Sequence, residues 1–227
     1  MDENQKIVIQ SQKAAEGVEE FFEFKDKFEE LMMYYECAIQ EVTTKFQVLN
    51  KEFSVRNQRN PIEYITFRVK KPLSILEKLN RKGLSITYES MQELNDIAGV
   101  RVICSFIDDI YMLANLLSRQ DDIHVLEVKD YIKNPKPNGY RSYHMIVEVP
   151  VFFSDCTRMM RVEVQIRTIA MNFWASLEHQ IHYKKFKEEN EEIVEQLAKC
   201  ANVIYETDVK MQQIREKLGE EGKVILE

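Results

Sequence analysis

The chain has 227 residues, 44% of them hydrophobic and 30% charged, so it can bury the core of one domain of ordinary size with additional helices. Its 38 acidic and 31 basic side chains leave a net charge of -7, which opposes broad electrostatic binding to nucleic acid or to an anionic membrane. No apolar run approaches the ~18 residues of a membrane span, and the four cysteines include no C-x-x-C pair. We therefore expect a cytoplasmic protein with no signal peptide, reduced thiols and no zinc site.

Long amphipathic helices are predicted near both ends of the chain, because apolar residues recur there every three or four positions. The aromatic residues between Phe21 and Phe53 are numerous, and this stripe packs either against its own domain or against another subunit. The predicted boundaries are a flexible tail at 1–18, an N-terminal oligomerisation helix at 19–58, a core domain at 59–186, a C-terminal helix at 187–219 and a tail at 220–227.

Strand and helix patterns alternate in the core domain. Alternation of apolar and polar residues, or a short apolar run, predicts each strand. Apolar residues at helical spacing predict one helix between Pro72 and Gly83 and another that begins at Asp108. We expect an α+β fold with a mixed sheet of about five strands and helices packed around it. The expected strands are 63–70, 100–104, 122–130, 142–149 and 160–168.

The last of these strands has one apolar and one polar face. Successive side chains of a strand point to opposite faces, which separates the core residues from the polar ones. The core face would carry Met160, Val162, Val164 and Ile166, and the polar face Arg161, Glu163, Gln165 and Arg167. The polar face suits a site for phosphates and a cation. The alternative is a solvated edge strand of alternating charge.

Basic residues gather on the first strand and the helix after it. Arg68 and Lys70 share one face of the strand, and Ser74, Lys78 and Arg81 share one face of the helix, so the cations converge on one concavity. The alternative is a basic helix face in water.

Further polar residues mark the strand mouth and a loop. Asp96 stands before an apolar strand, where it is either a metal ligand or a turn-forming aspartate, and Arg101 lies within that strand. The loop at 133–141 combines prolines and a glycine with an aromatic residue and cations, a mixture typical of ligand-binding loops.

Four short motifs follow one another along the chain and together resemble a known family. They are Arg68-Val-Lys70 with Ser74 and Lys78, Asp96-Ile-Ala-Gly-Val-Arg-Val, Asn138-Gly-Tyr-Arg-Ser-Tyr-His144, and Val162-Glu-Val-Gln-Ile-Arg-Thr with Phe173-Trp174-Ala175 and Glu178-His179. Together they resemble the synthetase domain of the RelA/SpoT family. The chain has no adjacent His-Asp pair of the kind the family's hydrolase domain uses, and it most resembles the single-domain small alarmone synthetases.

The resemblance implies a nucleotidyltransferase-like fold and a (p)ppGpp synthetase of the stringent response. Such enzymes transfer pyrophosphate from ATP to the 3'-hydroxyl of GDP or GTP, and many form homotetramers through their terminal helices. Relatives activated by their own product have a small residue before the Arg-x-Lys pair, where this chain has Phe67, and this difference argues against product activation.

The resemblance also assigns site residues. Adenine would lie between Arg68 and Arg101, and the phosphates of ATP against Lys70, Ser74, Lys78 and Arg81. Asp96 and Glu163 would hold Mg²⁺, and Glu163 would also accept the proton of the attacking hydroxyl. The acceptor nucleotide would contact Tyr140, which stacks on guanine, together with Asn138, His144, Gln165 and Lys129, the last at a place where relatives carry arginine.

Two other functions remain open at this point. A tRNA 3'-end pyrophosphokinase would keep the chemistry but needs a basic surface, which the acidic balance disfavours. A catalytically silent RNA- or nucleotide-binding homologue would lack Asp96, Glu163 or Tyr140, and all three are present. We expect ATP and GDP or GTP as partners, with no membrane and no stable nucleic-acid partner.

Overall fold

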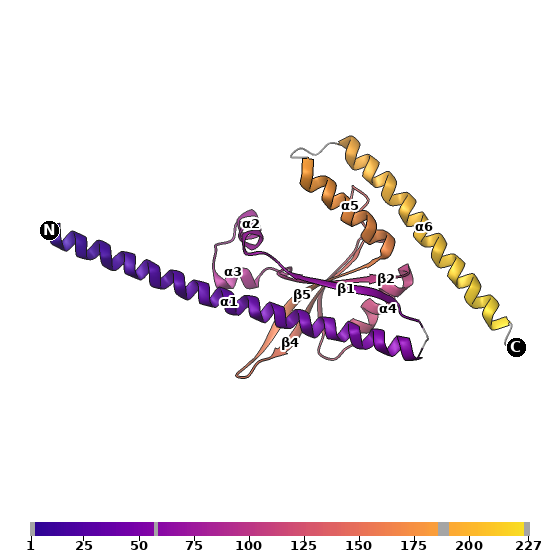
Figure 1. Cartoon of the computed structure of the whole chain (residues 1–227), viewed down its shortest axis with the longest axis horizontal. Coiled ribbons are helices and arrows are strands. Elements are labelled where there is room, and N and C mark those ends of the chain that lie inside the picture. Colours follow the sequence, from indigo (N-terminus) through magenta and orange to yellow (C-terminus); the bar gives the residue numbers. More distant parts are fainter. Residues whose placement is uncertain (1–2, 57–58, 186–190, 225–227) are drawn as a thin grey trace.

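The computed structural model describes residues 3–56, 59–185 and 191–224, and Figure 1 shows their arrangement. A five-stranded sheet forms the centre, and two long helices lie at the two ends of the chain. The elements are α1 (Glu3–Arg56), β1 (Ile62–Val69), α2 (Pro72–Lys82), α3 (Tyr88–Gln92), β2 (Ala98–Cys104), α4 (Ile107–Ser118), β3 (His124–Asp130), β4 (Tyr143–Phe152), β5 (Thr157–Thr168), α5 (Ile169–Lys185) and α6 (Glu191–Val224).

The sheet is mixed, with strand order β1-β2-β5-β4-β3. Only β2 and β5 run parallel, and the register between them places Gly99 opposite Glu163 and Arg101 opposite Gln165. The other three neighbouring pairs are antiparallel. The predicted mixed sheet with surrounding helices is confirmed, and the polar residues of β2 and β5 lie side by side at its middle.

The central strand β5 separates the core from the polar face as its alternation predicts. Val162, Val164 and Ile166 are fully buried, in one cluster with side chains of α1 and α4. The alternate side chains of β5 face the other side of the sheet and keep partial exposure, apart from Arg167, which is buried. The core therefore fixes the position of the polar side chains.

Helix α1 packs its apolar stripe on its own sheet from Leu31 to Phe53. Leu31 and Phe46 are fully buried there, which decides between the two readings of this part of the stripe. The N-terminal part of α1 projects past the sheet in Figure 1, and Phe24 on it is exposed. None of the helices within the described ranges is long and apolar enough to cross a membrane.

Two predicted boundaries need correction. The expected tail at 1–18 is helical from Glu3 onward, because α1 begins there and continues without a break. The C-terminal helix passes Gly219 and ends at Val224, so the expected tail at 220–227 begins as helix. Glycine lowers helix propensity by only about 1 kcal/mol, which a long helix tolerates. The expected start of that helix at 187 lies outside the described residues.

Helix α2 ends where its glycine predicts. Gly83 has φ 69°, in the left-handed region that favours glycine, and its N–H bonds to the carbonyls of the last helical turn. Ile75 and Leu79 of α2 are buried, and Lys78 on the same helix reaches Asp96, with Nζ 2.6 Å from Oδ1.

The packing of α1 generates a stability prediction. Leu31→Ala removes fully buried atoms and should lower the free energy of unfolding by about 2–5 kcal/mol, as buried leucines do. Val48→Ala, on an exposed position of the same helix, should change it by less than about 0.5 kcal/mol. Urea denaturation of both variants checks this, and equal losses would contradict the packing of α1 described above.

Candidate active site

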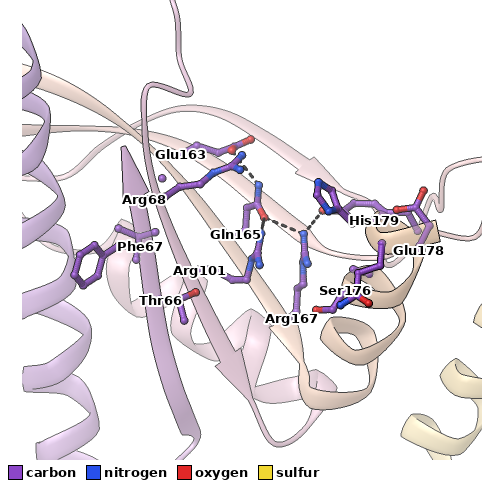
Figure 2. A pocket seen from close by; sticks show the side chains of 15 residues that line it. Thr66, Phe67, Arg68, Arg101, Glu163, Gln165, Arg167, Ser176, Glu178 and His179 are labelled. Carbon is purple, nitrogen blue, oxygen red and sulfur yellow. Dashed lines mark hydrogen bonds between the residues drawn. The ribbon is translucent and has the colours of Figure 1, made fainter. Parts of the chain in front are cut away.

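The polar face of the sheet forms one wall of a cavity of about 490 Å³. Its walls come from β1, β2, β5, α5 and Tyr140 (Figure 2). Side chains from adjacent strands point into it, and Phe67 points to the opposite side of β1 from Thr66 and Arg68. The lining residues that carry charge or an amide on the strands are Arg68, Arg101, Glu163, Gln165 and Arg167.

Guanidinium groups line this cavity from three strands. Arg101 is half-buried, and burial together with the charge of Arg167 lowers its pKa, although arginine remains protonated. Both cations share Gln165 Oε1, which accepts from Arg101 Nη2 at 3.4 Å and from Arg167 Nη2 at 2.9 Å. Gly99 of β2 adds no side chain beside Arg68, which leaves the cavity floor open there. The cavity is built for an anionic or planar ligand.

A second cavity of about 160 Å³ lies on the β3 side of the sheet, with both cationic and aromatic walls. Glu163 lines this cavity as well as the larger one. Its carboxylate therefore stands where two ligands, one in each cavity, would approach each other. The lining residues of the smaller cavity are Glu127, Lys129, Tyr131, Lys136, His144, Ile146 and Glu163.

Two neighbours hold the Glu163 carboxylate. His144 Nδ1 lies 3.4 Å from Oε1, and Gln165 Nε2 donates to Oε2 at 3.0 Å. Burial alone would raise the pKa of Glu163, but the hydrogen bond and charge of His144 and the hydrogen bond from Gln165 outweigh it, so the pKa is lowered. Glu163 is thus ionised at neutral pH, as a cation ligand must be.

Asp96 stands between two lysines. Lys70 Nζ lies 2.5 Å from Oδ2 and Lys78 Nζ 2.6 Å from Oδ1. Burial acts to raise the pKa of Asp96, but the two ammonium groups prevail and lower it. The charge of Asp96 also acts on Glu163, so the two carboxylates are electrostatic neighbours. The lysine cluster that the sequence places on one concavity is thus assembled around Asp96.

The loop between β3 and β4 brings Tyr140 to the cavities. Its hydroxyl accepts from Arg167 Nη2 at 2.6 Å and lies 2.8 Å from His144 Nε2. Lys136 Nζ stands 4.9 Å from the ring centroids of both Tyr131 and Tyr140. The aromatic ring of Tyr140 therefore sits at the border of the two cavities, among cations.

Most predicted site residues meet around these cavities. Arg68, Arg101, Tyr140 and Gln165 line the larger one, Lys129 and His144 line the smaller one, and Glu163 lines both. Lys70, Lys78 and Asp96 form the ion cluster. These three residues line neither cavity, and the same holds for the predicted residues Ser74, Arg81 and Asn138. Asn138 donates to Glu178 Oε1 at 3.2 Å.

Three residues of this site received no ligand in the sequence analysis. Arg167 was placed on the polar face of its strand, two residues after Gln165, but no contact was assigned to it. Lys136 lies in the loop that the sequence marks as ligand-binding, but its contact with two rings depends on the loop's path. Tyr131 gave no signal, since a tyrosine after a strand is as often part of a core.

The fold and the site together define a class of enzyme. A mixed sheet that presents two ionised carboxylates beside lysines, arginines and an aromatic ring is the framework of nucleotidyltransferase-like enzymes that act on phosphorylated nucleotides. Residues 67–188 match the family model described as the region found in RelA / SpoT proteins. The chain belongs to the RelA/SpoT family, which confirms the resemblance given by its four motifs.

Several small members of this family are similar over most of the chain. GTP pyrophosphokinase YwaC of Bacillus subtilis (strain 168) is 44% identical over 82% of this chain and 90% of its own length. The structure of small alarmone synthetase 1 of Bacillus subtilis bound to its product pppGpp is 34% identical and has a TM-score of 0.78, covering 86% of this chain and 99% of that one. A structure of the same synthetase bound to AMPCPP, with the same coverage, has 31% identity and a TM-score of 0.72.

The ion cluster at Asp96 generates a pH prediction. A carboxylate whose folded pKa is lowered stabilises the fold above its unfolded pKa of about 3.9, and this stability is lost as pH falls through the folded pKa. Asp96→Asn should therefore lower the free energy of unfolding at pH 7 and flatten its decline below about pH 4. Asp155→Asn, in the exposed turn between β4 and β5, is the control.

Denaturant titrations of both variants at stepped pH measure this effect. An Asp96→Asn protein with the stability and pH slope of the Asp155→Asn control would contradict the ion cluster.

Proposed function

We propose that this chain is a (p)ppGpp synthetase that transfers the terminal pyrophosphate of ATP to the 3'-hydroxyl of GDP or GTP and releases AMP. The observation that carries the proposal is the place of Glu163, an ionised carboxylate in the wall of two adjacent cavities with cationic linings. A two-nucleotide reaction needs two such cavities with a proton acceptor between them. The pyrophosphokinase name of one relative and the pppGpp bound to another support the same activity.

The larger cavity is the proposed ATP site. Arg68 and Arg101 reach it from neighbouring strands, and a planar guanidinium stacks well on a purine. Lysine serves phosphate as a point charge, and Lys70 and Lys78 stand at the Asp96 end of the site. Ser74 and Arg81 on α2 would contact the phosphates that extend out of the cavity. AMPCPP in a relative's structure supports an adenine nucleotide as donor.

The smaller cavity and Tyr140 form the proposed acceptor site. An aromatic ring stacks on a base with about 1–3 kcal/mol, and Tyr140 is the ring that touches both His144 and Arg167. Lys129 and Lys136 supply positive charge for the acceptor phosphates. Asn138 and Gln165 complete the set, Asn138 by bonding the Tyr140 N–H at 3.1 Å and so shaping the loop.

The two carboxylates suit Mg²⁺, which would neutralise charge on the transferred phosphoryl groups when bound with the nucleotide. Asp96 and Glu163 are ionised neighbours, but no group of three potential metal-ligating side chains occurs among the described residues. Phosphate oxygens and water must therefore complete the shell. Lys70 and Lys78 now neutralise Asp96, and we infer that they turn to the triphosphate when it enters, which frees Asp96 for the cation.

Glu163 is the proposed general base. The 3'-oxygen of the acceptor forms a bond to the β-phosphorus of ATP and gives its proton to the Glu163 carboxylate. The bond from the β-phosphorus to the oxygen that bridges it to the α-phosphorus breaks, and its electron pair leaves with AMP. Lys70 and Lys78 stabilise the charge that develops on the phosphoryl oxygens. The lowered pKa makes Glu163 a weak base, so positioning and electrostatics carry most of the rate.

Labelled ATP tests the proposal and its alternatives. Purified protein is incubated with ATP labelled at the β-phosphate and, separately, with GDP, GTP or deacylated tRNA. Label in GDP or GTP with release of unlabelled AMP is the expected result. Label in tRNA would select the tRNA 3'-end pyrophosphokinase, and label retained in ATP with every acceptor would select the silent homologue.

The role of Glu163 generates a prediction for the same assay. Glu163→Gln removes the proton acceptor and should lower kcat by ~10²- to 10⁴-fold while the melting temperature changes little. Glu148→Gln is the matched control, because Glu148 lies on the same sheet face outside both cavities. Near wild-type turnover of the Glu163→Gln protein would exclude Glu163 as the base.

We also propose that the chain forms a homotetramer through its terminal helices. Large apolar side chains remain exposed on α6 and α5, and exposed apolar patches favour association. They include Val203, Met211, Ile214 and Leu218 on α6, and Phe173, Leu177 and Ile181 on α5.

Charges on the exposed part of α6 test this assembly. Met211→Asp combined with Ile214→Asp should reduce the mass measured by light scattering after size exclusion, and leave the far-UV circular dichroism spectrum unchanged. A charge at Leu31 of α1 would not test the assembly, because Leu31 lies in the core of its own chain. A wild-type mass near the 27.0 kDa of one chain at micromolar concentration would contradict the tetramer.

A further inference from the structure

Helix α6 packs directly on the loop that carries Tyr140. We call residues 131–142, between β3 and β4, the acceptor loop. Gly139 in this loop has φ 87°, and a Cβ atom there would lie 2.5 Å from Ala201 Cβ and 3.0 Å from Ala198 Cα. A glycine is therefore required both by the backbone conformation and by the approach of α6. The loop is shaped to fit against this helix.

Arg141 ties the loop to α6 on the other side of Tyr140. Its Nη2 donates to Asn202 Oδ1 at 3.0 Å, and its guanidinium lies 4.6 Å from the ring centroid of Tyr205. Its Nη1 donates to the carbonyl of Gly139 at 3.1 Å, inside the loop. Arg141 thus connects two α6 side chains to the backbone just before Tyr140.

The helix is itself anchored to rigid parts of the fold. The buried Thr168 at the end of β5 donates to Asp208 at 2.5 Å, and the Trp174 indole N–H of α5 donates to the Leu197 carbonyl at 3.1 Å. Trp174 and Ala201 form a small cluster against which Tyr140 packs. The residues that line the two proposed nucleotide cavities, in contrast, come from β1 to β5, the acceptor loop and α5. Helix α6 therefore holds the loop from behind.

We propose that Ala201, Asn202 and Tyr205 of α6 are positioning residues that hold the acceptor loop in the conformation that binds the guanine nucleotide. The inference rests on the proposed function for the identity of the acceptor. The acceptor loop contains no strand, although backbone hydrogen bonds join Lys136 to Tyr140 and to Gly139 within it. Ordering such a loop during binding costs conformational entropy. Contact with α6 orders it beforehand, so affinity for the acceptor depends on a helix that lines neither cavity.

A pair of variants at Tyr205 tests the proposal. Tyr205→Leu removes the ring under Arg141, whereas Tyr205→Phe keeps it. The loss of one cation–π contact predicts a KM for GDP raised about 5- to 30-fold in Tyr205→Leu, with KM for ATP and kcat at saturating GDP within about twofold of wild type. Tyr205→Phe should match wild type. A uniform loss of activity, or equal behaviour of the two variants, would overturn the positioning role.

Two further variants keep the test independent of folding defects. Asn202→Ala acts at an exposed position and should raise the KM for GDP in the same selective way, since it removes the hydrogen bond from Arg141. Glu206→Ala, also exposed on α6, is the matched control and should leave every constant unchanged. If the Tyr205→Leu protein fails to fold, the test rests on Asn202→Ala. An Asn202→Ala protein with the same kinetic constants as Glu206→Ala would then overturn the proposal.

Hydrogen exchange separates this inference from the proposed function. Amide exchange of residues 133–141 should be faster in Tyr205→Leu and Asn202→Ala than in Tyr205→Phe, Glu206→Ala and wild type, whatever reaction the protein catalyses. An unchanged exchange rate together with a changed KM for GDP would refute the positioning of the acceptor loop by α6. Faster exchange in a protein that labels neither GDP nor GTP would retain the loop contact and refute both the guanine acceptor and the role assigned here.

Discussion

The ionised carboxylate of Glu163 is the constraint on which the rest of the site depends. It must remain charged although it is largely buried, and His144 and Gln165 provide the contacts that make this possible. Burying a carboxylate without such partners would cost several kcal/mol or protonate it. The alternation of β5 then fixes where the charge stands, because Val162 and Val164 on either side are locked in the core.

Compensation of charge explains the arrangement around Glu163. Arg101 and Arg167 crowd each other across β2 and β5, and Gln165 relieves this by accepting from both. Lys70 and Lys78 are held by Asp96 in the same way. Gln165 and Asp96 thus hold these four cationic side chains in place. A polyphosphate can replace Gln165 and Asp96 as their partner with little reorganisation of the site.

Much of this could be predicted from the sequence because local rules govern it. The period of two in β5 gave both faces correctly, and Pro72 and Gly83 gave the ends of α2. The start of α1 and the passage of α6 through Gly219 were not predictable, since a polar segment and a lone glycine both permit helix. Contacts between segments that are distant in the sequence could not be predicted either. Nothing in the spacing of Arg167 and Tyr140, or of the acceptor loop and α6, says that they touch.

The central claim is that two nucleotides meet at Glu163 from two cavities. A crystal structure of the chain with AMPCPP, GDP and Mg²⁺ tests it most directly. Adenine should lie between Arg68 and Arg101, guanine on the ring of Tyr140, and the 3'-oxygen of GDP within hydrogen-bond distance of the Glu163 carboxylate, about 2.6–3.2 Å. Guanine placed away from the ring of Tyr140, or a 3'-oxygen that contacts another side chain while Glu163 faces solvent, would contradict the account.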